Sequence, residues 1–175
     1  MELDRAGRMA DKLIKLFDPC CEKLEIAGSI RRMCDDVKDI EIVAQPRKDL
    51  QLPHIDMILA GLHVKDRIEY DKNGTRFKSF WLLSKKNKQI IKVDLFIVYP
   101  PATWGCIFLI RTGPERFSKW LVNHAKPYYR FHKGQLFHSF ESKAKDWQEK
   151  HLDTPTEQSV FDFLSLQYIP PQKRK

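Results

Sequence analysis

The sequence has few cysteines: four in 175 residues, at Cys20, Cys21, Cys34 and Cys106. They have neither the paired spacing of a zinc site nor the density of a disulfide-stabilised secreted domain. No apolar run approaches the roughly 20 residues that span a bilayer, and the N-terminus lacks the basic start and apolar centre of a signal peptide. We therefore expect an intracellular protein of the cytoplasm or nucleoid that is not secreted and has no membrane partner.

Acidic residues are also in the minority. The chain has 31 Lys and Arg against 23 Asp and Glu, a formal charge of +8, which favours a polyanionic partner such as nucleic acid. Its six histidines are scattered without ligand spacing, so we expect no histidine metal site. The length allows one sizeable core, or such a core with a small lobe attached.

Periodicity and turn residues predict the elements of the first hundred residues. The apolar spacing over 3–17 predicts a helix that ends at Asp18-Pro19, and Asn-Gly at 73–74 predicts a hairpin. The other expected elements are strands over 23–27 and 38–44, a short helical turn after Gly28-Ser29, a helix over 54–62, a return strand over 75–83, a turn over 84–88 and a strand over 89–99.

Beyond Pro100-Pro101 the pattern becomes helical, with helices expected over 102–111, 114–125 and 157–166 and a small hairpin over 128–131 and 135–137. The last eight residues are basic and irregular. We predict an α/β (α+β) fold in which a mixed or antiparallel sheet with flanking helices fills residues 1–100. Residues 101–175 then form a small, mainly helical lobe with a short hairpin.

Three carboxylates carry the main functional signal. Asp39 and Glu41 lie two apart in a predicted strand, so they project from one face with Cα atoms about 6.5–7 Å apart. Asp94 interrupts the apolar run 90–98, where an unpaired carboxylate is costly. If the two strands are neighbours, the three side chains can hold two divalent ions about 3.5–4 Å apart for phosphoryl transfer. Magnesium suits an all-oxygen site. The alternative for Asp39 and Glu41 is a pair of solvated charges.

A possible phosphate site precedes the acidic pair. Gly28-Ser29 forms a turn whose backbone can approach phosphate oxygens, and Ser29 supplies a hydroxyl donor. The guanidinium groups of Arg31 and Arg32 can clamp a triphosphate.

These motifs together resemble a known family. The segment 26–32 (Ile-Ala-Gly-Ser-Ile-Arg-Arg), followed by 38–43 (Lys-Asp-Ile-Glu-Ile-Val), is similar to the palm signature of DNA polymerase family X, the polymerase beta group of nucleotidyltransferases. The resemblance implies that Ser29 and Arg32 bind triphosphate, and that Asp39, Glu41 and Asp94 bind metal. It also implies that Asp94 is the base or orienter for the primer 3′-hydroxyl. The family usually has Asp where this chain has Glu41.

The resemblance continues downstream. The segment 109–114 (Leu-Ile-Arg-Thr-Gly-Pro) resembles the family segment that lies along the incoming sugar, with Thr112 and Gly113 matching. Ile110 and Arg111 replace the usual aromatic pair, so sugar selectivity is not implied. The run 160–164 with Tyr168, Pro171 and Arg174 resembles the closing motif. The whole resembles the minimal palm-plus-thumb form of small viral members, and we expect neither a lyase domain nor helix-hairpin-helix clamps.

The resemblance implies a DNA polymerase that adds dNTPs to a primer 3′-hydroxyl on primer-template or gapped DNA, in repair or gap filling. Two Mg²⁺ ions are the expected cofactors, with Mn²⁺ as a substitute. Two alternatives stay open: a template-independent or ribonucleotide-using transferase of the same superfamily, and a non-catalytic nucleic-acid-binding module. The sequence identifies no protein partner.

Several basic and aromatic residues are candidate DNA contacts. Candidate phosphate contacts are Lys85, Lys86, Lys88, Lys119, Lys126, Lys173 and Arg174. The aromatic residues Trp81, Trp104, Phe108, Phe117 and Trp120 are expected to pack in the core, whereas Tyr128, Tyr129, Phe131 and His132 are candidates for touching template or nucleotide.

Overall fold

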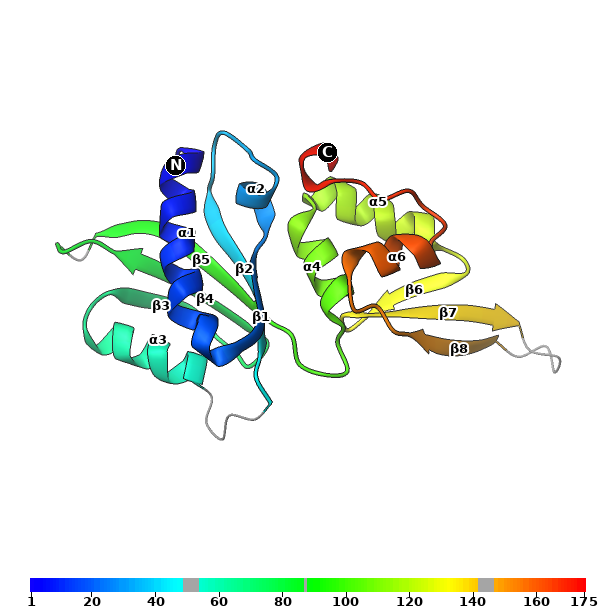
Figure 1. Cartoon of the computed structure of the whole chain (residues 1–175), viewed down its shortest axis with the longest axis horizontal. Helices are drawn as coiled ribbons and strands as arrows, with labels where there is room; N and C mark the ends of the chain where they lie inside the picture. Colours follow the sequence, from blue (N-terminus) through cyan, green and yellow to red (C-terminus); the bar gives the residue numbers. More distant parts are fainter. Residues whose placement is uncertain (49–53, 87, 142–146) are drawn as a thin grey trace. The chain divides into compact units, whose positions relative to one another are not determined.

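The computed structural model describes residues 1–48, 54–86, 88–141 and 147–175 (Figure 1). The chain divides into two compact units, Met1–Val98 and Tyr99–Lys175. Position 87 of the predicted turn 84–88 lies outside the described residues. No helix in the described ranges is both long enough and apolar enough to cross a membrane.

The N-terminal unit begins with a helix whose sequence explains both its face and its end. Ala6, Ala10, Leu13 and Phe17 recur at intervals of three and four, and all four are buried. Proline in Asp18-Pro19 cannot continue an α-helix, and a 3₁₀ turn, η1 (Asp18–Cys20), follows. In order, the unit contains α1 (Leu3–Phe17), β1 (Cys21–Ile26), α2 (Gly28–Arg31), β2 (Asp39–Pro46), α3 (His54–Val64), β3 (Ile68–Asn73), β4 (Phe77–Leu83) and β5 (Gln89–Ile97).

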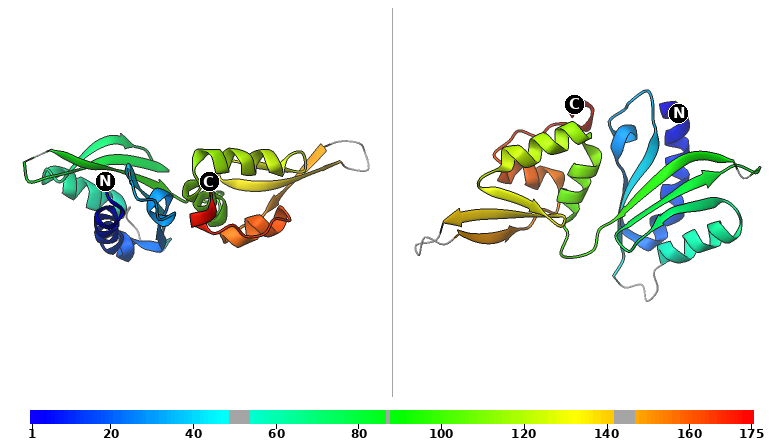
Figure 2. Two further views of the ribbon diagram at one scale, coloured as in Figure 1. Left: turned by 90° about the horizontal axis from the view of Figure 1, so that it is seen from above. Right: turned by 180° about the vertical axis from the view of Figure 1, so that it is seen from behind.

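Its five strands form one mixed sheet in the order β1-β2-β5-β4-β3. Only the central β2 and β5 pair in parallel, and every other neighbouring pair is antiparallel. Helices α1 and α3 lie on the same face of this sheet (Figures 1 and 2), where Phe17 and Leu59 pack with Ile40, Ile42 and Leu95 in the core. The mixed sheet with flanking helices is therefore as predicted. Neither α1 nor α3 covers the opposite face of the sheet.

The C-terminal unit packs three helices with a small antiparallel sheet ordered β6-β7-β8. Leu109, Leu121, Leu136 and Phe161 come from four different elements and form its buried centre. The elements are α4 (Trp104–Thr112), α5 (Glu115–Ala125), β6 (Tyr129–His132), β7 (Gln135–Glu141), β8 (Trp147–Leu152), α6 (Glu157–Phe163) and the 3₁₀ turn η2 (Pro171–Lys173).

Two features of this unit differ from the sequence prediction. The predicted short hairpin is part of a three-stranded sheet, because β7 extends to Glu141 and pairs with β8. The sequence of β8 is polar and has little apolar alternation, and its exposed residues are Gln148, Glu149, Lys150 and His151. The segment is therefore a strand because it pairs with β7, and not because of its own sequence pattern. The last helix begins at Glu157 as predicted but ends at Phe163. A capping box between Thr156 and Ser159 defines its start.

Candidate functional site

Charged side chains gather on the sheet face opposite α1 and α3. Ile40 and Ile42 of β2 are fully buried in the core, so Asp39 and Glu41 project from the other face. Parallel pairing places Asp39 beside Lys92, and Glu41 beside Asp94. The register therefore brings the three carboxylates of the sequence prediction onto one face of two adjacent strands.

Asp94 is held by a hydroxyl from the next strand. Ser79 on β4 is the register partner of Asp94, and its Oγ donates a hydrogen bond to Asp94 Oδ1 at 2.7 Å. Ser79 is fully buried, while Asp94 is half-buried. One oxygen of this carboxylate is thus fixed by the protein, which restricts the orientation of the whole group.

The pKa of Asp39 depends both on its burial and on the charges of neighbouring residues. Burial raises the pKa of the Asp39 carboxyl, and the negative charge of Asp94 raises it further. The charges of Lys92 and Arg32 act in the opposite direction, and lower this pKa. Added positive charge would therefore favour the ionised form of Asp39, a property typical of carboxylates in cation-binding sites.

A lysine from the same face completes this charged group. Lys92 Nζ lies 2.9 Å from Asp71 Oδ2 on β3. The hydrogen bond that Lys92 donates to Asp71 raises the pKa of Lys92, and the charges of Asp94 and Asp39 contribute in the same direction. Asp71 is the extra residue of a β-bulge between Tyr70 and Lys72. A β-bulge changes the direction in which a side chain points. Asp71 can therefore reach Lys92 of β5, although β3 and β5 are not neighbours in the sheet.

The glycine-serine turn packs directly against the acidic pair. Gly28 has a φ of +59°, and a Cβ at this position would overlap the carboxylate of Glu41. The backbone N–H of Ala27 donates to the Glu41 carbonyl oxygen at 2.8 Å, which ties the turn to β2. Within the described residues, the buried hydroxyl of Ser29 has no hydrogen-bond partner. Arg31 is half-buried at the end of α2.

The three carboxylates have the right chemistry for magnesium, but in the described residues they do not lie close enough together to form a set of metal ligands. Asp39, Glu41 and Asp94 offer only carboxylate oxygens, the donors that Mg²⁺ prefers. In the described part of the chain, however, no three His, Cys, Asp or Glu side chains lie in a geometry that could hold an ion. Asp94 instead accepts from Ser79, and Lys92 lies beside Asp39 in the register.

The two predicted sugar-segment residues belong to the C-terminal unit. Thr112 is the last residue of α4 and is fully buried, which does not fit a direct nucleotide contact by its side chain. Gly113 follows as the C-cap, and its N–H donates to the Leu109 carbonyl oxygen at 3.1 Å. A Cβ on Gly113 would overlap the ring of Phe117, so close packing requires glycine here.

Six of the seven predicted phosphate contacts are exposed. Lys119 forms an ion pair with Glu115 one turn earlier on α5. The exposed residues are Lys85, Lys86 and Lys88 of the N-terminal unit and Lys119, Lys126 and Lys173 of the C-terminal unit. Their accessibility fits contact with a polyanion in each unit.

Arg174 does not fit its predicted DNA contact. Its side chain is 0% exposed, and Nη1 donates to Glu157 Oε1 at 2.6 Å. The guanidinium also lies 5.5 Å from the ring centroid of Phe117, 5.7 Å from that of Phe161 and 5.6 Å from that of Tyr168. This residue therefore anchors the basic tail to α5 and α6, a role that a sequence ending in Lys-Arg-Lys does not reveal.

Comparison with known proteins bears on the C-terminal unit. Residues 107–175 match the family model described as DNA polymerase beta thumb. The C-terminal unit is similar to a polymerase beta thumb. This confirms the family X resemblance over the matched segment and supports a family X polymerase-like module that binds nucleic acid. No curated protein matches the chain.

Sequence reasoning missed three residues that contact or surround the carboxylates. Lys92 could have been found, because it lies two positions before Asp94 in the same strand and must share its face. Ser79 depends on the hairpin register, and Asp71 on a bulge, so neither has a signal in the linear pattern.

Proposed function

We propose that this chain is a magnesium-dependent, DNA-directed nucleotidyltransferase that adds deoxynucleotides to a primer 3′-hydroxyl, in gap filling or repair. The observation that carries the proposal is the register of β2 and β5, which places Asp94 beside Glu41 and on the face of Asp39. The match of the following unit to a DNA polymerase thumb supports the same reaction class.

Each residue of the face has a part in this proposal. Asp39, Glu41 and Asp94 would hold the metal through carboxylate oxygens. When bound, two Mg²⁺ ions supply charge neutralisation for the triphosphate and lower the pKa of an attacking hydroxyl. Asp94, oriented by Ser79, accepts or orients the proton of the primer 3′-hydroxyl. Its fixed Oδ1 limits the ways in which the second oxygen can meet that hydroxyl.

The turn before β2 supplies the proposed triphosphate contacts. The Ser29 hydroxyl is buried without a partner in the described residues, and a phosphate oxygen would satisfy it. The positive charge of Arg32 lowers the pKa of Asp39, so its guanidinium lies near this carboxylate, and guanidinium groups can pair with phosphate. Gly28 lets Glu41 approach the turn, so that the phosphate contacts and the carboxylates stay close.

Primer extension on gapped DNA tests the proposal. We expect extension with Mg²⁺ and none with EDTA, and a loss of about 10²-fold or more for Asp39→Ala and for Asp94→Ala. Asp11→Ala changes an exposed aspartate of α1 and is the matched control, with activity as in the wild type. Equal extension by all four proteins would overturn the proposed mechanism.

The same assay addresses the template and the sugar. Ile110 packs against the core of the C-terminal unit, and Arg111 is exposed on α4, where the family usually has an aromatic pair. Each dNTP and NTP is supplied alone, with and without a template strand. Incorporation that follows the template base supports the DNA-directed reaction, whereas incorporation without template supports the template-independent alternative.

A second candidate is a nucleic-acid-binding module without catalysis. It is favoured by the lack of a three-ligand ion site in the described residues and by Lys92 beside the carboxylates. This candidate predicts tight DNA binding that is the same in Mg²⁺ and EDTA and does not respond to added dNTP. Titration of labelled gapped DNA under these conditions separates it from the enzyme.

A further inference from the structure

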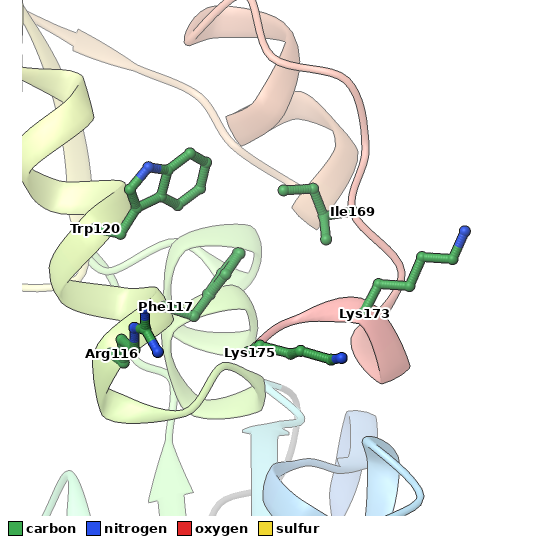
Figure 3. A pocket seen from close by; sticks show the side chains of 6 residues that line it. All are labelled: Arg116, Phe117, Trp120, Ile169, Lys173 and Lys175. Carbon is green, nitrogen blue, oxygen red and sulfur yellow. The ribbon is translucent and has the colours of Figure 1, made fainter.

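A pocket of about 450 Å³ lies on the C-terminal unit between α5 and the C-terminal segment (Figure 3). Its lining residues are Arg116, Phe117, Trp120, Ile169, Lys173 and Lys175. The volume is in the range of pockets that hold small ligands. All six residues belong to one unit, and none of them is among the predicted carboxylate, triphosphate or sugar positions.

The apolar part of the pocket is formed mainly by two aromatic rings, and a buried arginine packs against one of them. Phe117 is 4% exposed, and the buried Arg174 lies over its ring. The ring centroid of Trp120 lies 5.6 Å from that of Phe117 and 5.6 Å from that of His124. Trp120 is nevertheless 42% exposed, so the expectation that it packs in the core is wrong. A fixed but accessible indole loses little conformational entropy when a ligand stacks on it.

The charged side chains that line the pocket are all cationic. Arg116, Lys173 and Lys175 are exposed, and no described carboxylate lies within ion-pair distance of them. By contrast, Lys119, Arg130 and Arg174 of the same unit each pair with a glutamate. In Figure 3, Arg116 and Lys175 both lie below the Phe117 ring, which points between Trp120 and Ile169. The pocket therefore combines an aromatic face with local positive charge.

This combination selects one ligand chemistry. A simple anion needs no exposed indole, and an apolar ligand gains nothing from three cations. Bases in duplex DNA are stacked on one another, so they have no free face for Trp120. An unpaired nucleotide has both a π-face and a phosphate, and proteins that hold single strands pair aromatic stacking with basic side chains.

We propose that this pocket is an accessory single-strand site, in which an unpaired base stacks on Trp120 while backbone phosphates contact Arg116, Lys173 and Lys175. It would give the protein a hold on an unpaired stretch of DNA in addition to the duplex contacts expected of a polymerase thumb. The inference uses only the C-terminal unit and does not depend on the carboxylates.

The test measures binding of the full chain to 5′-fluorescein-labelled dT₁₂ and to a blunt hairpin duplex, by anisotropy in EDTA without nucleotide. Trp120→Ala and Trp120→Leu should each weaken dT₁₂ binding about five-fold or more, with duplex affinity unchanged. Trp120→Phe keeps an aromatic face and should retain dT₁₂ binding. Trp120→Leu is the matched control for bulk, since it keeps apolar volume without a π-face.

The charges are tested by salt dependence. Changing Lys173 and Lys175 together to Gln should reduce the slope of log K against log salt by about 1.4 for dT₁₂, because each single-strand phosphate contact contributes about 0.7. The same double change at Lys12 and Lys15, exposed on α1, should leave the slope unaltered.

Two results would overturn the inference. One is wild-type dT₁₂ affinity in Trp120→Leu, which would leave an acidic protein surface as the better fit to the pocket. The other is an equal loss on single strand and duplex. Because the assay has no metal and no nucleotide, a protein inactive in primer extension can still support the single-strand site, and the two proposals fail separately.

Discussion

The carboxylate of Glu41 lies against Gly28 in space that a Cβ would occupy. Gly28 also has a left-handed φ of +59°, which costs other residues about 1–2 kcal/mol. The turn and the acidic strand are thus joined by a contact that only glycine allows. Any side chain at position 28 must displace Glu41 or the turn.

Gly28→Ala should therefore lower the free energy of unfolding by about 1–2 kcal/mol or more and reduce primer extension. Gly7→Ala is the matched control, because Gly7 lies within α1 and no atom lies within 4 Å of the position that an alanine Cβ would occupy. That change should stabilise the protein by about 0.5–1 kcal/mol. Urea unfolding measures both, and an unchanged midpoint in Gly28→Ala would contradict the packing described.

The buried ion pair between Arg174 and Glu157 predicts a large effect from a position in the basic tail. Arg174→Met leaves the Glu157 carboxylate buried without its cation, and should lower the free energy of unfolding by about 3–5 kcal/mol. Lys173→Met, at an exposed neighbour, should change it by no more than about 0.5 kcal/mol. Equal midpoints for the two variants in urea would show that Arg174 is not an anchor.

Alkaline pH should weaken the fold through Cys21. Burial, followed by the negative charges of Cys20 and Asp18, raises the pKa of the Cys21 thiol from 9.0 to about 12. Above pH 9 the unfolded chain releases this proton while the folded chain keeps it, so the stabilisation present below pH 9 is lost as pH rises toward 12.

Urea midpoints between pH 8 and pH 11 measure this loss. The decline should be shallower in Cys21→Ala than in the wild type. Cys34→Ala, at a half-buried cysteine, should follow the wild-type slope. A Cys21→Ala slope equal to that of the wild type would refute the assignment.

Lys92 is expected to compete with divalent ions for the carboxylates. Its ammonium group forms an ion pair with Asp71 and is attracted by the negative charges of Asp94 and Asp39. Lys92→Gln should therefore tighten Mn²⁺ binding by up to about ten-fold in the absence of DNA. Lys88→Gln makes the same charge change at an exposed position before β5 and should have little effect. Calorimetric titration decides, and no gain in Lys92→Gln would argue against this competition.

Much of the fold follows from local pattern. The α1 helix has the predicted bounds and the predicted hairpin of β3 and β4 forms, because amphipathic spacing and turn residues are local signals. Asn73 still belongs to β3, so the turn follows this residue instead of including it. The β8 strand is not predicted from the sequence, because its polar sequence has little apolar alternation and the strand depends on pairing with β7. The parallel pairing of β2 and β5 is a non-local property that the sequence left open between a mixed and an antiparallel sheet.

The candidate site, too, could be predicted only in part. The alternation of side chains along a strand predicts from the sequence alone that Asp39 and Glu41 share one face of β2. The hydrogen bond from Ser79 and the contact of Asp71 with Lys92 require a register and a bulge, which are set by tertiary pairing. Arg174 was misjudged because a basic tail is normally solvated, and only packing against Phe117 and Glu157 makes it a core residue.

We propose that Asp94, beside Glu41 on the shared face, takes part in nucleotidyl transfer. Single-turnover primer extension with Mg²⁺ and saturating dNTP measures this role by comparing Asp94→Asn with Asp11→Asn. We expect Asp94→Asn to slow the step by about 10²–10⁴-fold and Asp11→Asn to have no effect. Wild-type rates in Asp94→Asn would show that Asp94 takes no part in the reaction.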